Sequence, residues 1–137
     1  MAIDIFNAPK SVIADGLEGK VILIYGSNNL GKSAQATRFP KPFVIACEMG
    51  LNGIDGVPYM AVTRWSDFKT IVKQFTGATK DKAKELYSTI IVDEVYASSL
   101  YCQDYVCSTF GDGALTMADG DGKHNLYQLY EKEYFKQ

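Results

Sequence analysis

Four short runs of apolar residues, each followed by polar or glycine-rich sequence, predict the strands of the fold: 21–25, 43–47, 57–62 and 89–92. The first, second and fourth runs are apolar at almost every position, which is typical of parallel strands covered on both faces. The third run is weaker, and Pro58 indicates an edge strand because proline lacks the N–H that a second neighbour would need. The pattern therefore predicts an α/β fold with a mainly parallel sheet.

The stretches between and after these runs predict helices over 32–38, 66–76, 97–109 and 125–135, and a charged connector or short helix over 80–85. Ser66 and Asp67 offer capping side chains, and Gly77 can end the same helix. Apolar residues recur at helical spacing in two of these segments, as Phe68, Ile71, Val72 and Phe75 and as Leu126, Leu129, Tyr130 and Tyr134. Glycine and aspartate dominate residues 111–124, which predicts an exposed flexible loop.

Length and composition indicate one globular domain over residues 1–137, with 47% hydrophobic and 22% charged residues. No apolar run is long enough for a transmembrane helix, and the N-terminus lacks the features of a signal peptide. Three cysteines without C-x-x-C spacing do not predict a disulfide framework or a zinc site. We therefore expect a cytoplasmic protein without membrane contact. The net charge of −2 gives no general attraction to nucleic acid, so any such contact must be local.

The clearest chemical signal directly follows the first apolar run. Residues 26–33 match the Walker A or P-loop pattern G-x-x-x-x-G-K-[ST], as Gly26, Ser27, Asn28, Asn29, Leu30, Gly31, Lys32 and Ser33. Such a loop wraps nucleotide phosphates with backbone N–H groups, and the following helix, here including Ala34, points its positive end at them. Lys32 would reach the β and γ phosphates, while the Ser33 hydroxyl would ligate Mg²⁺. The expected cofactors are ATP and Mg²⁺.

A second signal ends the fourth apolar run. Ile90 to Val92 leads into Asp93, as in a Walker B strand, and Asp93 would hold Mg²⁺ opposite Ser33. Hydrolysis also needs a carboxylate that polarises the attacking water. Glu94 follows Asp93 directly, and Glu48 ends the run at 43–47, so both remain candidates for the general base.

With these motifs placed, the sequence resembles the phage-type RecA-like P-loop ATPases, AAA-domain nucleotide-binding phage proteins of the single-strand annealing and recombination group. Three segments carry the resemblance, 24–33, 39–48 and 87–93, and it covers about residues 20 to 110. It implies a three-layer α/β/α fold, ATP hydrolysis in DNA recombination, and a role for Glu48 as the catalytic glutamate. The implied partners are single-stranded DNA, further copies of the chain, and phage recombination or replication proteins, in the host cytoplasm if the protein is phage-encoded.

The sequence departs from this family in two places. Glu94 stands where the family usually has a small hydroxyl residue, which keeps Glu94 open as the base. RecA-like folds also place a later strand between the phosphate-loop strand and the Asp93 strand, and nothing after Asp93 has that pattern. We therefore expect a C-terminally incomplete domain in which the two motif strands pair directly or leave a gap. The expected turnover is below about 1 s⁻¹, an ordinary enzyme rate.

Two other functions compete with an ATPase domain. A DNA-binding or assembly module could use nucleotide as a structural switch without significant hydrolysis, and the missing strand favours this alternative. A small-molecule kinase shares the phosphate loop but would need arginines to clamp the transferred phosphate. The chain has only Arg38 and Arg64, so the kinase ranks last.

Overall fold

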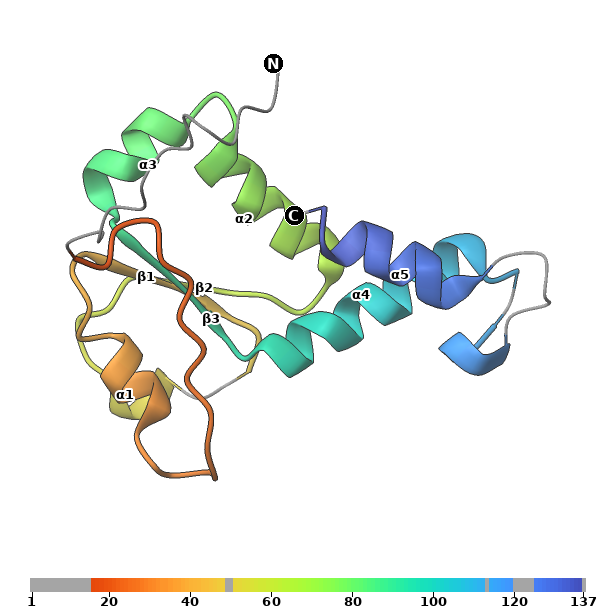
Figure 1. The fold of residues 1–137 in the computed structure, drawn as a ribbon, viewed down its shortest axis with the longest axis horizontal. Helices are drawn as coiled ribbons and strands as arrows, with labels where there is room; N and C mark the ends of the chain where they lie inside the picture. The colour runs from red at the N-terminus through yellow and green to blue at the C-terminus, as the bar shows by residue number, and fades with distance from the viewer. Residues whose placement is uncertain (1–15, 49–50, 113, 120–124, 137) are drawn as a thin grey trace, which may run out of the picture.

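The computed structural model describes residues 16–48, 51–112, 114–119 and 125–136 (Figure 1). Their elements follow the order α1 (Lys32–Ala36), β1 (Pro42–Ala46), a 3₁₀ helix (Leu51–Gly53), β2 (Tyr59–Ala61), α2 (Trp65–Thr76), α3 (Lys80–Leu86), β3 (Thr89–Asp93), α4 (Val95–Phe110), a second 3₁₀ helix (Met117–Asp119) and α5 (Leu126–Tyr134). Figure 1 shows α2 and α3 above the strands and α1 below them. The chain is thus α/β, as the sequence predicts.

Within the described residues, the sheet has three strands in the order β2-β1-β3, and both pairs are parallel. The register sets Ala46 of β1 opposite Asp93 of β3 and Ala61 of β2, so all three strands end at the same edge. β2 lies at an edge of the sheet, which confirms the prediction from Pro58. β1 lies between two neighbours and is the most buried strand, with Val44 fully inaccessible to solvent. The sheet therefore brings the residues that follow β1 and β3 together.

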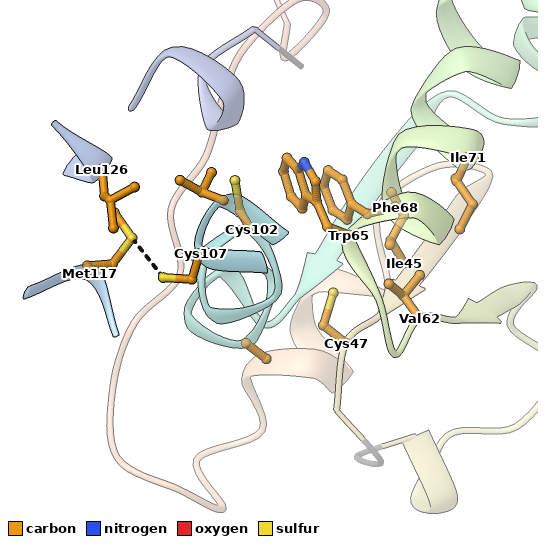
Figure 2. Packing of buried hydrophobic residues seen from close by; sticks show 12 residues of the cluster. Ile45, Cys47, Val62, Trp65, Phe68, Ile71, Cys102, Cys107, Met117 and Leu126 are labelled. Carbon is orange, nitrogen blue, oxygen red and sulfur yellow. Dashed lines mark hydrogen bonds between the residues drawn. The ribbon is translucent and has the colours of Figure 1, made fainter. Parts of the chain in front are cut away.

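Helices α2, α4 and α5 form the main core beside β1 (Figure 2). The Trp65 ring stacks on Phe68 at a centroid distance of 4.9 Å and on Tyr134 of α5 at 5.4 Å. The helical stripes predicted in α2 and α5 are confirmed, since their apolar residues are buried or pack against this core. All three cysteines are buried, and Cys102 and Cys107 belong to the core face of α4.

Polar contacts also fasten α5 to α2. Glu133 accepts hydrogen bonds from Lys69 Nζ at 3.0 Å and from Trp65 Nε1 at 3.1 Å. Burial alone would raise the pKa of Glu133, but these two hydrogen bonds outweigh it and lower the pKa. Burial likewise works to lower the pKa of Lys69, yet its hydrogen bonds to Glu133 and Tyr105 raise it. Both shifts favour the charged pair, which therefore holds α5 in place.

Most predicted helices are confirmed with shifted ends. α4 is longer than predicted, α1 is shorter, and 80–85 lies in a short helix, one of the two alternatives left open. The predicted capping of α2 is wrong. The helix begins at Trp65, its N-cap is Arg64, and no side chain caps it. Asp67 instead forms an ion pair with Arg64 at 3.4 Å, because both predicted capping residues lie inside the first turn of the helix.

The predicted buried strand at 21–25 is wrong. Figure 1 draws this stretch as coil, and its side chains are exposed, with Val21 at 100% and Tyr25 at 86%. The nearest strand is β3, but a cavity of about 390 Å³ is lined by both segments and lies between them. A strand needs a neighbouring backbone at about 5 Å to form its hydrogen-bonded ladder. Of the two expected arrangements, direct pairing or a gap beside the Asp93 strand, the structure has the gap.

The predicted loop at 111–124 is only partly correct. Gly111 and Met117 are buried, and Cys107 Sγ contacts Met117 Sδ at 3.7 Å (Figure 2). The thioether of Met117 fills space beside α4 and α5, which explains why this part of a glycine-rich segment packs against the core. Residues 113 and 120–124 of the predicted loop lie outside the described residues.

Candidate nucleotide-binding site

The loop at 26–33 connects the exposed segment to α1 through left-handed backbone. Gly31, the N-cap of α1, has φ 76°, and Asn29 has φ 62°. Glycine adopts this region without strain, and asparagine tolerates it better than most residues. At Gly26, with φ 152°, an added Cβ would lie 3.2 Å from Leu30 Cδ1. The glycine and asparagine positions of the motif therefore match the turn that the loop makes.

Lys32 closes this loop on itself. Its Nζ donates hydrogen bonds to the carbonyl oxygens of Gly26 at 2.9 Å and Ser27 at 2.8 Å. The ammonium group thereby lies against the first two residues of the motif, within the turn whose backbone would surround a phosphate. The bonds are solvent-exposed, so a phosphate oxygen could replace either carbonyl without uncovering a buried group.

Ser33 and Asp93, which are 60 residues apart in the sequence, meet in the structure. Ser33 Oγ donates a hydrogen bond to Asp93 Oδ2 at 2.5 Å. The structure therefore brings together one residue of the predicted Walker A loop and the acid of the predicted Walker B strand. Hydroxyl and carboxylate oxygens are the ligand types that Mg²⁺ prefers. No cluster of three or more metal-binding His, Cys, Asp or Glu side chains occurs among the described residues, so a metal here would rely on these two oxygens, water and a bound phosphate.

One cavity of about 390 Å³ brings the candidate residues together. Its lining includes Gly26, Lys32, Ser33, Asp93 and Glu94. The remaining loop residues predicted to bind nucleotide, Ser27 to Gly31, and Ala34 in α1 are not among the lining residues. The other walls are largely apolar and come from the exposed segment, β3 and the start of α4. The cavity thus combines cationic and acidic groups with largely apolar walls, and its part between residues 22–25 and β3 is called the apolar slot below.

Glu48 is placed differently from Glu94. Glu48 lines a neighbouring cavity of about 420 Å³ on the β2 side of β1. Its main chain nevertheless lies beside the Asp93 residue, because the N–H groups of Cys47 and Glu48 both donate to the Asp93 carbonyl, at 2.6 Å and 3.3 Å. The two acidic candidates therefore flank Asp93 from opposite sides.

Two further groups, the Cys47 thiol and the Tyr101 hydroxyl, lie near these acidic residues. Burial, followed by the negative charges of Asp93 and Glu94, raises the pKa of the Cys47 thiol to about 11. Cys47 is thus a neutral packing residue at neutral pH. Tyr101 of α4 donates its hydroxyl to the Cys47 carbonyl at 2.8 Å. Sequence reasoning missed this contact, since a tyrosine in a helix of mixed apolar and polar residues carries no distinguishing pattern.

Comparisons with known proteins agree with this geometry. A family model described as an AAA domain matches residues 18–137. The chain is also similar to the SPbeta prophage-derived uncharacterized protein YorG of Bacillus subtilis (strain 168), with 50% identity over 137 residues. The match covers 100% of this chain but 42% of that relative.

No solved structure matches the chain. In the part of the chain that the structure describes, every helix is too short or too polar to cross a membrane. The family match covers most of the sequence, including both motifs and all the described strands. The chain belongs to the AAA domain family.

Proposed function

We propose that this chain is an ATP-binding, Mg²⁺-dependent P-loop ATPase domain of the phage RecA-like type. The observation that carries the proposal is the meeting of the Walker A loop with Asp93, through the hydrogen bond from Ser33 Oγ at 2.5 Å. Two motifs that are far apart in sequence, the phosphate loop and the strand that ends in Asp93, contribute residues to one cavity. Membership of the AAA domain family supports the same function.

Each residue then has a distinct role. Residues Gly26 to Ala34 surround the phosphates, and Lys32 exchanges its two carbonyl partners for β- and γ-phosphate oxygens. Ser33 and Asp93 hold Mg²⁺, which supplies charge neutralisation for the transferred phosphoryl group. The apolar slot between the exposed segment and β3 adjoins these groups on one side of the site.

We propose Glu48 as the general base, with Glu94 as the alternative. The resemblance to RecA-like ATPases supports Glu48, and its backbone bond to the Asp93 carbonyl keeps it at the edge where the strands end. Glu94 shares the cavity with Lys32 and Ser33, which supports the alternative. A carboxylate in either position can polarise a water for attack on the γ-phosphate.

The biological setting is proposed from similarity. The resemblance to RecA-like phage proteins and the prophage origin of the relative support a role in DNA recombination or single-strand annealing in a host cytoplasm. Single-stranded DNA, other copies of the chain, and phage recombination or replication proteins are the proposed partners. The chain spans 42% of the relative's length, so the activity of a longer protein can depend on further segments.

We also propose that a further strand completes the sheet between 21–25 and β3. The exposed apolar side chains on both sides of the slot, including Ile90 at 49%, support this, because β3 pairs only with β1 among the described strands. Without that strand, the loop lacks firm support from the sheet, and we expect turnover below about 1 s⁻¹.

The same gap favours a second function, a nucleotide-switched DNA-binding or assembly module that binds ATP without significant hydrolysis. A kinase remains the weakest candidate, since neither Arg38 nor Arg64 lines the cavity.

Lys32→Ala tests the proposed function directly. We expect ATP affinity, measured by titration with a fluorescent ATP analogue in Mg²⁺, to fall at least about 10- to 100-fold. A hydrogen bond to a charged group contributes about 1.5–3 kcal/mol, and each 1.4 kcal/mol is tenfold in affinity. Lys84→Ala is the matched control, because it removes an exposed lysine from α3 and should leave the affinity unchanged. Equal affinity for Lys32→Ala and the wild type would refute the proposal.

A further inference from the structure

The peptide group between Cys47 and Glu48 is held at both of its polar atoms. Its carbonyl oxygen accepts a hydrogen bond from the Tyr101 hydroxyl at 2.8 Å, and its N–H donates to the Asp93 carbonyl at 3.3 Å. The N–H of Cys47 donates to the same Asp93 carbonyl at 2.6 Å. A peptide group is planar, so bonds at both sides fix its orientation and with it the direction in which the Glu48 Cα leaves β1.

Tyr101 can fix this peptide because its own position is well defined. It lies in the second turn of α4, whose first residue follows Glu94, and its ring packs partly buried against the main core. α4 also contacts α2 and α5. The hydroxyl is therefore presented from a helix joined through Glu94 to β3, the strand that carries Asp93. The end of β1 is thus tied to β3 directly and, through Tyr101, to the helix that follows β3.

Tyr101 lies outside both candidate cavities. It lines neither the cavity that holds Lys32 and Ser33 nor the one that holds Glu48. Its hydrogen bond to the Cys47 carbonyl is the contact that links it to Glu48. A general base needs placement within a fraction of an ångström of its water, so a small rotation of this peptide would misplace the Glu48 carboxylate.

We infer that Tyr101 is a positioning residue for Glu48, an inference that rests on the proposed ATPase function with Glu48 as base. The tyrosine hydroxyl orients the Cys47–Glu48 peptide, and this orientation sets where the glutamate side chain leaves the end of β1, beside Asp93. The role requires the hydroxyl and not the ring, since the ring serves packing.

Tyr101→Phe separates the role of the hydroxyl from that of the ring, because it removes the hydroxyl and keeps the ring. Hydrogen exchange at the Glu48 amide, which is the N–H of this peptide, reads out its orientation directly, whether or not ATP is present. We expect exchange at the Glu48 amide to become at least about tenfold faster. The free energy of global unfolding should stay close to that of the wild type, which shows that the fold is kept. Tyr105→Phe is the control, because its hydroxyl interacts with Lys69 instead. Unchanged exchange in Tyr101→Phe would overturn the inference.

Single-turnover hydrolysis of Mg–ATP then tests the effect on catalysis. We expect Tyr101→Phe to slow hydrolysis about 5- to 20-fold with ATP affinity within about twofold of the wild type. In the double variant with Glu48→Gln, the tyrosine change should cause no further loss, because both changes affect one group. A normal hydrolysis rate in Tyr101→Phe, or an undiminished further loss in the double variant, would overturn the positioning role.

The proposed function fails differently. It fails when the wild type does not bind ATP or when Lys32→Ala binds ATP as well as the wild type, and the role of Tyr101 in hydrolysis then fails with it. If the wild type binds and hydrolyses ATP but the Tyr101 results are negative, only the positioning role is overturned.

Discussion

Strand β1 and the segment 21–25 are each five residues long and apolar in character, yet their surroundings differ completely. In β1, Val44 is fully buried between two parallel neighbours and beside the helices of the core. In the segment before the phosphate loop, Val21 is fully exposed and faces no hydrogen-bonded neighbour among the described residues. The two stretches have similar sequence patterns but opposite burial.

The difference teaches that an apolar run acquires a structural role only through a neighbour. β1 receives hydrogen bonds from both sides and side-chain contacts from α2 and α4, so its burial stabilises the fold. The segment 21–25 borders the slot beside β3, and its apolar side chains contribute little to the stability of the described chain. The core side, which is β1 with helices α2, α4 and α5, therefore maintains the fold. The loop side, which is segment 21–25 with the phosphate loop at 26–33, carries the candidate chemistry and has few stabilising contacts.

The sharpest test of this contrast compares an aromatic side chain from each side. Trp65→Ala should reduce the free energy of unfolding by about 3–5 kcal/mol, because it removes a buried ring that stacks on Phe68 and Tyr134. Tyr25→Ala should change it by less than about 0.5 kcal/mol, since that ring is exposed. Urea unfolding followed by far-UV circular dichroism measures both, because the only tryptophan is lost in one variant. Similar losses in the two variants would contradict the comparison.

A second pair of variants compares glycines. In Gly111→Ala the new Cβ would lie 2.4 Å from the Cys107 carbonyl oxygen and 2.9 Å from Ala114 Cβ, so we expect a loss of about 1–3 kcal/mol. Gly31→Ala meets no atom within 4 Å, and its cost of about 1 kcal/mol comes from its positive φ. Thermal and urea unfolding of both variants give the comparison. A greater loss at Gly31 would show that the phosphate loop is more constrained than the core.

The smallest expected effect concerns the contact that fastens α5. Glu133→Gln should cost about 1–2 kcal/mol at pH 7, because it removes a charged partner of Lys69 and Trp65. The pKa of Glu133 is lowered, so its contribution is present above its ordinary value of 4.5 and is lost as the pH falls through the folded pKa. The pKa of Lys69 is raised, so its contribution is present below 10.5 and is lost as the pH rises through the folded pKa.

Unfolding of the wild type and of Glu133→Gln as a function of pH measures this contribution. The difference between them should be greatest between about pH 5 and pH 10 and should shrink on either side. Glu131→Gln, an exposed change on the same helix, should give no such pH dependence. A difference that stays constant from pH 3 to pH 11 would contradict the ion pair as the cause.

Sequence patterns predicted most elements of the core side. The apolar stripes in α2 and α5 and the apolar runs at β1 and β3 were sufficient to predict these elements. Each stripe keeps helical spacing throughout, and each run is continuous and bounded by polar or glycine-containing sequence. The start of α2 was not predicted, since Arg64 and Trp65 give no capping pattern. The burial of Met117 was also missed, because a single apolar residue in a glycine-rich segment has no periodicity.

The candidate site was predicted in part. The motif identified Lys32, Ser33 and Asp93, and the structure brings Ser33 and Asp93 into contact. The sequence could not predict that Glu48 and Glu94 line separate cavities. This placement depends on the strand order, which sets the Glu48 cavity beside β2 and the Glu94 cavity beside β3. Nor could the bond from Tyr101, since it depends on how α4 packs over the end of β1.

By itself, the sequence determined the phosphate-loop motif, because its pattern lies within eight consecutive residues. It also determined the parallel α/β character, because apolar runs alternate with helical stripes along the chain. Only the tertiary structure decided which apolar runs are buried, which acid lies in which cavity, and which tyrosine holds the end of β1. Burial and hydrogen bonding between distant segments depend on neighbours, and a neighbour is a property of the folded chain.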